Sequence, residues 1–425
     1  MKGLIKLKLG YSRINITPHT DIKNLELQGF GYFLERSYID ILDDIYTNCF
    51  YLETEENKAV IINSDLLNYD SYTVETVKGA IQKELGIKKS NIILIATHTH
   101  AAPSVAFLNG CGEYNSEYIN FMIPLLIKAA KEAVGNITEV KRISSGKIKF
   151  LPVGFNRAHS DGPVDAGLTV IHFELLNKPD YFILNHGCHP VTIGSQRYIS
   201  ADFPGVVVEL LQKDGLNGVF LNGYCGDIDP LRKNYDTRSR ECMYKTGEAI
   251  YTAFKELLDK GMKEEPKSIK CIDFSEVIDL LPITNDDIDK ELKAVENIKE
   301  SNPRYYRAVY EWTKIAKEKI SHPNPYVQTF QIQALRVGNA VILATQGEVF
   351  TQLGLDIKGN FPENNILICG NANECFGYIP TDNSIAERDY GGYGSCIALA
   401  RVPLKPGTAV KIVNAAILVL KDILN

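Results

Sequence analysis

A strand–helix–strand unit in the first quarter of the chain most constrains the fold. The apolar segment KAVIINSDLL at 58–67 predicts a buried strand, and NIILIATH at 91–98 predicts a second one. Between them, at 71–86, apolar side chains recur at the spacing of one face of an amphipathic helix. Strands joined through a helix pair in parallel within one sheet. The chain is therefore expected to build a partly parallel sheet with helices packed on it.

The rest of the chain alternates between strand-like and helix-like segments. The turn NKPD at 177–180 separates two apolar segments that predict an antiparallel pair, and Gly338-Asn339 predicts a hairpin. This pattern predicts the α/β class, with mixed central β-sheets flanked by helices in α/β/β/α layers. Further strands are expected at 218–227 and 364–373, and helices at 117–136, 203–215, 237–262, 284–320 with a break at Pro303, and 406–424.

The chain is interpreted as a single domain over residues 1–425. The region 262–325 is the most polar and the richest in predicted helix, so we expect it to form a helical subdomain or a lid. The sequence does not separate these two alternatives, and it gives no indication of the oligomeric state.

Composition excludes two classes of partner. The net charge is −6, and no basic block provides the positive face that nucleic-acid binding needs. Lysines interrupt the apolar residues of the N-terminus, and no apolar run approaches the roughly 18–20 residues of a membrane span. The nine cysteines are odd in number and scattered, which favours reduced thiols. We therefore expect a cytoplasmic protein without stable membrane insertion.

Four predicted strands end in polar side chains that can bind a metal. The strand at 91–98 leads to His98 and His100, and the strand before GCHP leads to His186 and His189. The other two lead to Asp227 and Asp229 in GDIDP and to Glu348 in TQGE. Open α/β sheets place their sites at the carboxyl ends of strands, and zinc takes nitrogen and oxygen ligands. If the strand continues through His100, both imidazoles of the HTH segment point the same way. The pattern predicts a hydrolytic site of the zinc type.

Six short segments in order resemble one known family. They are ATHTHAAPS, FNRAHSDGPVD, NHGCHPVTIG, GDIDP, QGEVFTQLG and GYIPTDNSIAERDYGG. Together they resemble the catalytic domain of the neutral/alkaline, non-lysosomal ceramidase family over roughly residues 9–400. Members of that family use one zinc ion to hydrolyse an amide. The resemblance implies the same cofactor, Zn²⁺, at one ion per chain, with a second divalent metal as an alternative.

The resemblance also implies roles for single residues. The metal ligands that it implies are His98, His189, Glu348 and Tyr378. His100, Arg157 and Tyr390 are implied to face the substrate, and Asp229 occupies the place of a family serine near the scissile amide.

Several alternatives stay open for these residues. His186 competes with His189 as the ligand after its strand, and Tyr378 competes with a purely packed tyrosine. Arg157 is expected either to contact substrate or to bridge to Asp161 or Asp165. Asp65, at another strand end, is expected to support a ligand histidine or to approach the metal. The remaining histidines, His19, His159, His172 and His322, are interpreted as structural or surface residues.

Three features depart from the ceramidases of this family. Asp229 replaces the family serine, and a carboxylate suits a general base or the binding of an ammonium group or second metal. The C-terminal β-sandwich domain of the ceramidases is expected to be absent, because the chain ends in an apolar helical segment. Neither a leader nor a membrane-docking surface is evident. These departures weaken ceramide as the substrate more than they weaken the predicted site.

The sequence therefore predicts a metal-dependent hydrolase that cleaves a carboxamide bond in a small-molecule acyl-amide by attack of metal-activated water. The first alternative is a metal-dependent esterase, lactonase or deacetylase acting on a small soluble substrate. The second is a non-catalytic protein with a structural metal.

Overall fold

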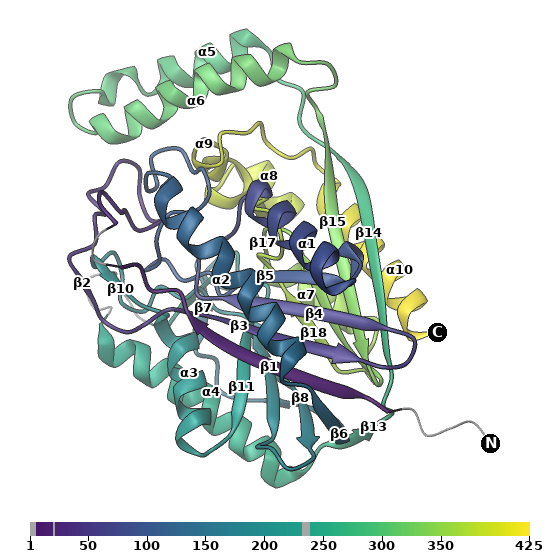
Figure 1. The fold of residues 1–425 in the computed structure, drawn as a ribbon. Helices are drawn as coiled ribbons and strands as arrows, with labels where there is room; N and C mark the ends of the chain where they lie inside the picture. Colours follow the sequence, from purple (N-terminus) through teal and green to yellow (C-terminus); the bar gives the residue numbers. More distant parts are fainter. Residues whose placement is uncertain (1–5, 20–21, 232–238) are drawn as a thin grey trace.

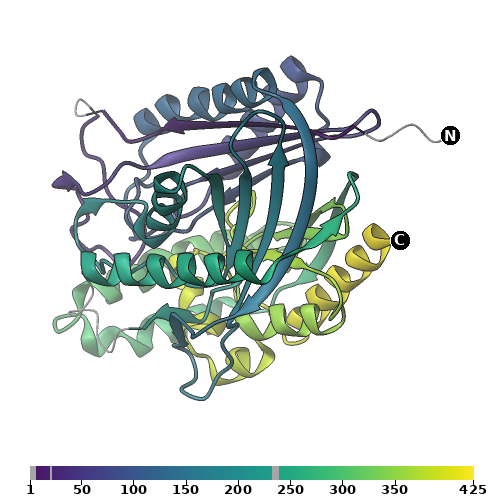
Figure 2. The same ribbon diagram turned by 90° about the horizontal axis from the view of Figure 1, so that it is seen from below.

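The computed structural model describes residues 6–19, 22–231 and 239–425, and it has two β-sheets packed face to face with helices on their outer sides (Figure 2). Between the sheets lies a dry core in which Phe50, Ile61 and Ile93 of one sheet meet Leu335 and Ile342 of the other. The predicted α/β/β/α layering is confirmed, because each sheet buries one apolar face against the other sheet and one against helices.

The first sheet has nine strands within the described residues, in the order β11-β9-β8-β6-β1-β3-β4-β5, with β13 added to β6. The pairs β4–β5 and β9–β11 are parallel and the other pairs are antiparallel. Its strands are β1 (Lys8–Asn15), β3 (Tyr46–Glu53), β4 (Lys58–Ser64), β5 (Ile92–Ala96), β6 (Thr138–Lys149), β8 (Gly167–Leu175), β9 (Tyr181–His186), β11 (Asn217–Asn222) and β13 (Lys263–Glu265).

The second sheet has the order β14-β15-β16-β18. The hairpin predicted at Gly338-Asn339 joins β15 and β16, and β16 pairs with β18 in parallel. Its strands are β14 (Ile269–Asp279), β15 (Val327–Val337), β16 (Ala340–Thr345) and β18 (Ile366–Cys369), and short two-stranded pairings join β2 (Asp40–Ile41) to β10 (Tyr198–Ile199), β7 (Gly154–Asn156) to β12 (Ile228–Pro230), and β17 (Glu348–Val349) to β19 (Tyr378–Ile379).

Three groups of helices cover the outer faces (Figure 1). The first group, α1 and α2, packs on the β1–β5 half of the first sheet, and α3 and α4 pack on its β8, β9 and β11 half. The second sheet packs against α7 and α10. The helices are α1 (Ser71–Leu85), α2 (Ser116–Gly135), α3 (Asp202–Lys213), α4 (Arg240–Lys260), α5 (Asn285–Ala294), α6 (Pro303–Ser321), α7 (Thr351–Gly359), α8 (Asp382–Glu387), α9 (Ser395–Ala398) and α10 (Thr408–Leu424).

The strand–helix–strand unit has the predicted form. The Asp70 side chain accepts a hydrogen bond from the Thr73 backbone amide and caps the start of α1, and Gly86 ends the helix in the left-handed conformation. The strands on either side, β4 and β5, pair in parallel with Ile62 opposite Leu94. Local capping and the apolar periodicity therefore both stabilise the same strand–helix–strand unit. The helix predicted at 237–262 is α4, and residues 237 and 238 lie outside the described residues.

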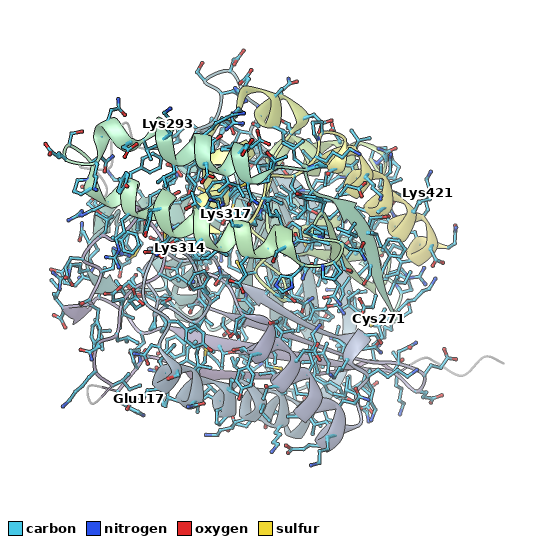
Figure 3. All side chains as sticks on the ribbon, turned by 90° about the horizontal axis from the view of Figure 1, so that it is seen from above. Glu117, Cys271, Lys293, Lys314, Lys317 and Lys421 are labelled. Carbon is cyan, nitrogen blue, oxygen red and sulfur yellow. The ribbon has the colours of Figure 1, made fainter. Side chains whose placement is uncertain are left out.

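The region 262–325 is only partly helical. Residues 263–265 and 269–279 are the strands β13 and β14, so a helical interpretation of that part is wrong. The α5 and α6 helices connect β14 to β15 and lie side by side beyond the end of this strand pair (Figure 1). Figure 3 looks down on them, with Lys293 labelled on α5 and Lys317 on α6. Pro303 takes the first turn of α6, where its missing N–H costs nothing.

All nine cysteines are free thiols, and seven of them are buried. They pack as small apolar side chains, as the sequence predicted. Among the residues that the structure describes, none of the helices combines the length and the apolar composition needed to cross a membrane.

Candidate metal and active site

His98 follows β5, but the strand does not carry it. The ladder ends at Ala96, and His98 has a left-handed backbone with φ of 70°, so the condition that the strand continues through His100 is not met. The turn places the Nδ1 atom of His98 2.8 Å from the carbonyl oxygen of Leu67. The imidazole is 1% exposed and its Nε2 atom points into the molecule. A buried turn therefore aims this side chain more firmly than a strand end would.

His189 follows β9 and meets His98. Its Nδ1 atom lies 2.6 Å from the carbonyl oxygen of Cys225, and its Nε2 atom lies 3.2 Å from the Nε2 atom of His98. His186 has a different environment, because its Nδ1 atom contacts the carbonyl oxygen of Gly167 and its ring packs on Phe150. Of the two candidates after this strand, the fold brings His189 to the site.

Glu348 and Tyr378 are brought together by a short parallel pairing. Strands β17 and β19 place the two residues directly opposite one another. The Oε2 atom of Glu348 lies 3.2 Å from the Nε2 atoms of both His98 and His189. His98, His189 and Glu348 follow three separate strands, β5, β9 and β16, and their side chains meet; Tyr378, which the family resemblance implied, is the first residue of β19.

The three atoms that converge, two imidazole nitrogens and one carboxylate oxygen, present lone pairs to one another with no proton between them. A carbonyl oxygen only accepts, so the Nδ1 atoms of His98 and His189 carry the ring protons and their Nε2 atoms present lone pairs. Burial, together with the charge of Arg157, lowers the pKa of His189 to about 4, which keeps that imidazole neutral. The Glu348 Oε2 atom is buried and has no hydrogen-bond partner among the described residues. Two nitrogens and one carboxylate oxygen that converge in this way fit a divalent cation.

His100 stands beside this cluster. Its ring centroid lies 5.0 Å from that of His98 and 5.5 Å from that of His189. Ligand atoms of these three histidines all lie within 4.8 Å of one another. His100 can therefore face either the same cation or a substrate bound next to it.

Arg157 connects the cluster to the carboxylate of Asp229. Its Nη1 atom donates to Asp229 Oδ1 at 3.0 Å, which does not support the alternative of a bridge to Asp161 or Asp165, and Asp165 pairs with Lys358. Burial opposes the charge of Arg157, but the neighbouring Tyr378 and Asp229 raise its pKa well above the ordinary value. Arg157 is therefore a fixed cation at the edge of the cluster.

The Nη2 atom of Arg157 lies near His189 but does not donate a hydrogen bond to its Nε2 atom. It lies 2.8 Å from the Tyr378 hydroxyl, 2.9 Å from the carbonyl oxygen of Gly226 and 3.3 Å from His189 Nε2. An Nη atom carries two protons, so the two shorter contacts use both of them. The lone pair of His189 Nε2 is thus still free for a cation.

The other predicted carboxylates have structural partners. Asp227 accepts hydrogen bonds from Asn156 Nδ2 and from the backbone amide of Thr351, each at 2.7 Å. Asp65 accepts from the backbone amide of Tyr46 at 2.9 Å, and burial raises its pKa to about 7. The backbone carbonyl of Leu67, and not Asp65, supports His98.

A histidine outside the cluster shows the contrast. His172 lies 2.8 Å from Asp180 through its Nε2 atom and stacks on Phe182, with ring centroids 4.3 Å apart. It has the structural environment that the sequence analysis expected.

A cavity of about 710 Å³ adjoins the cluster. His100, Arg157, Asp229 and Tyr378 line it, whereas His98, His189 and Glu348 are not among its lining residues. Tyr390 lies at its edge, 54% exposed, with its ring centroid 5.5 Å from that of Tyr378. A cavity of this volume can hold a small organic molecule beside Arg157, which contacts His189 of the cluster.

Sequence reasoning missed several residues of the cavity wall. Phe30, Tyr32 and Phe350 line it from loops and helix ends without any periodic pattern. Asp389 also lines it, and its side chain accepts a hydrogen bond from the backbone amide of Gly392, which caps the turn that carries Tyr390. An aspartate before a glycine-rich segment is a typical cap and was the one available signal.

Comparison with known proteins identifies the fold. No protein-family model and no curated protein matches the chain. The neutral ceramidase from Pseudomonas aeruginosa superimposes with a TM-score of 0.74 at 17% identity, over 99% of this chain and 75% of that one. A ceramidase complexed with C2 gives a TM-score of 0.74 at 16% identity, over 99% and 76% of the two chains. The chain therefore has the fold of the neutral ceramidases.

Proposed function

We propose that this protein is a metal-dependent hydrolase of the neutral/alkaline ceramidase family that cleaves a carboxamide bond in a small-molecule acyl-amide. The observation that carries the proposal is the convergence of His98 Nε2, His189 Nε2 and Glu348 Oε2 within 3.2 Å of one another. Arg157, which contacts His189, and Tyr378 line the adjoining cavity. The shared fold with ceramidases and the ordered sequence segments support it further.

The proposed cofactor is one Zn²⁺ per chain, held by His98, His189, Glu348 and Tyr378. The donor set of imidazole, carboxylate and phenol suits zinc, and a mixed set of this kind is typical of catalytic sites more than of structural ones. Tyr378 contributes through the hydroxyl that already faces Arg157. His100 is the residue that would join a second divalent metal, because its nitrogens lie within reach of the same point.

The side chains around the cation site have three further roles in the proposed reaction: charge stabilisation, positioning and proton transfer. A divalent ion bound there supplies a Lewis acid that polarises a carbonyl group and activates water. Arg157 holds a positive charge beside the Tyr378 hydroxyl, where negative charge on a carbonyl oxygen would be stabilised. Asp229 orients Arg157 through their 3.0 Å contact, which favours a positioning role over that of a free base. His100, which lines the cavity, would take up the proton released by the attacking water and give it to the leaving amine.

The cavity supports an acyl-amide whose acyl part is apolar. Aromatic side chains of Phe30, Tyr32, Phe155, Phe350 and Tyr390 line it, together with the polar side chains of His100, Arg157 and Asp229. The polar side chains would orient the carboxamide group by hydrogen bonds, and the aromatic side chains would bury the apolar acyl chain. An ester would undergo the same attack, so a metal-dependent esterase is the second candidate.

Metal content and turnover test the proposal together. Purified protein would be analysed by plasma emission spectrometry and screened against short-chain N-acyl amines, matched esters and ceramides. The variant His98→Ala should lose the zinc and the turnover. The matched control is His172→Ala, which removes an equally large imidazole from the Asp180 contact and should keep both.

Two results would contradict the proposal. Full turnover in a metal-free His98→Ala protein would separate catalysis from the cluster. A zinc ion whose removal unfolds the chain, in a protein that hydrolyses neither amides nor esters, would favour a structural metal. Hydrolysis of esters alone would select the esterase candidate.

A further inference from the structure

We propose that Arg36 is a positioning residue for His100, and that it acts through the loop 29–36 and the segment at Ser195–Gln196. The inference rests on the role given to His100 in the proposed function. It concerns a residue outside the cluster, because Arg36 neither lines the cavity nor approaches the converging lone pairs.

His100 has nothing of its own that fixes the ring. Neither ring nitrogen has a hydrogen-bond partner within the described part of the chain, and both atoms are buried. His98 and His189 differ, because a backbone carbonyl holds each Nδ1 atom. The orientation of the His100 imidazole therefore depends on the surfaces packed against it.

The loop at Gly29 and Phe30 provides that surface. The Phe30 ring meets the His100 ring edge to face, with centroids 5.0 Å apart. A Cβ atom on Gly29 would lie 2.4 Å from His100 Nδ1, and Gly29 has φ of +93°. Phe30 also has a positive φ, of 63°, which L-residues rarely adopt without support from their surroundings. The loop thus presses its backbone directly against the imidazole.

Arg36 ties this loop to His100 and to the opposite wall. Its Nη2 atom donates to the His100 carbonyl oxygen at 2.5 Å, and its Nη1 atom donates to the carbonyl oxygens of Ser195 at 2.8 Å and Gln196 at 2.9 Å. Its Cζ atom lies 4.9 Å from the centroid of the Phe30 ring. One side chain therefore touches the backbone of His100, the ring that packs on it, and the segment that carries Ser195 on the cavity wall.

A cation at this place is costly for the fold. Arg36 is 1% exposed, and all of the hydrogen-bond acceptors that it reaches among the described residues are backbone carbonyls. Burial lowers its pKa to about 10. Even buried ion pairs can often be replaced by well-packed apolar side chains without loss of stability, so a buried charge is weak evidence for a stabilising role. The gain from Arg36 is then the fixed geometry of three chain segments around one imidazole.

A double-mutant cycle tests the link. Arg36→Met and Arg36→Lys would be measured in the wild-type and His100→Ala backgrounds, with zinc content and turnover of the best amide or ester. Arg36→Met should keep its zinc and lower kcat roughly ten- to hundredfold with little change in KM. Arg36→Lys should restore part of this loss. In the His100→Ala background, Arg36→Met should cost almost nothing further.

Arg336→Met is the matched control. Arg336 also donates to two backbone carbonyls, those of Ile423 and Leu424, and also has a buried Nε atom without a partner in the described chain. It lies on β15 at the end of α10, so its loss should reduce stability and leave kcat unchanged. Full additivity of Arg36→Met and His100→Ala, or an equal kcat loss in Arg336→Met, would overturn the proposal.

Nuclear magnetic resonance provides a readout that does not need turnover. Protein labelled with ¹³C at the histidine Cε1 position should give one sharp His100 signal, identified by its loss in His100→Ala. Arg36→Met and Gly29→Ala should broaden or split this signal, and Arg336→Met should not. An unchanged His100 signal in folded Arg36→Met or Gly29→Ala protein would refute the positioning role. If the wild type hydrolyses no amide or ester, the proposed function fails while this measurement still decides the role of Arg36.

Discussion

The ion pair between Arg157 and Asp229 allows a quantitative test by Asp229→Ala. The side chains are 22% and 4% exposed, so both charges lie largely out of water. At the 3.0 Å contact, Coulomb attraction amounts to about 5.5 kcal/mol at an effective dielectric constant of about 20. Removing one partner of a buried pair typically costs about 3–5 kcal/mol. Arg157 keeps its contacts to Gly226 and Tyr378, so we expect a loss in the lower part of that range.

This loss translates into a measurable shift of the melting temperature. The unfolding entropy of a 425-residue chain is about 0.9 kcal/mol/K, so Tm should fall by about 3–5 °C. Calorimetry and guanidinium unfolding would measure it, with the zinc content unchanged and kcat reduced because Arg157 loses its orientation. The double variant with Arg157→Met should be less destabilised than the sum of the two single variants.

An exposed pair serves as the control for this experiment. Asp289→Ala removes the partner of Lys317, where the aspartate and lysine side chains are 57% and 41% exposed, and should scarcely move Tm. A loss of less than about 1 kcal/mol in Asp229→Ala, the value of an exposed pair, would refute the reasoning that Asp229 holds a buried Arg157 in place.

Three further predictions address other parts of the molecule. Burial lowers the pKa of Lys78 to about 8, so the unfolded chain binds its proton more tightly, and stability is lost as the pH falls from about 10.5 to 8. Lys78→Met should remove this slope and raise the free energy of unfolding at pH 7 by up to about 3 kcal/mol. Glu348→Gln should lower zinc affinity, measured by competition with a chelator, by more than roughly tenfold. Gly377→Ala, at φ of +90° and with its Cβ 2.1 Å from a Leu399 methyl, should cost about 1–2 kcal/mol in thermal unfolding.

A contrary result would be informative in each case. An unchanged pH slope in Lys78→Met would move the titration to another group. Zinc affinity that survives Glu348→Gln would exclude this carboxylate as a ligand. Wild-type stability in Gly377→Ala would mean that β19 shifts without cost, so that Tyr378 is not held rigidly by its strand.

The strands and helices with strong periodicity were accessible from sequence. The apolar runs that became β4, β5, β9 and β16 are each buried on both faces, and such runs signal themselves locally. By contrast, β14 is an edge strand with mostly half-exposed or exposed side chains, and only its pairing with β15 makes it a strand. The residues that pair with β14 lie 48 to 68 positions further along the chain, so the local sequence does not indicate them.

The site divides in the same way. By itself the sequence determined that polar side chains able to bind a metal follow several strands, because the end of an apolar segment can be recognised from the amino-acid sequence. Only the tertiary structure decided that His189 and not His186 meets His98, that Arg157 pairs with Asp229, and that Arg36 lies behind His100. These choices depend on left-handed turns and loop crossings, where a difference of one or two residues changes which side chain points inward. Composition and periodicity determined the layers, and the packing of distant loops determined which atoms converge.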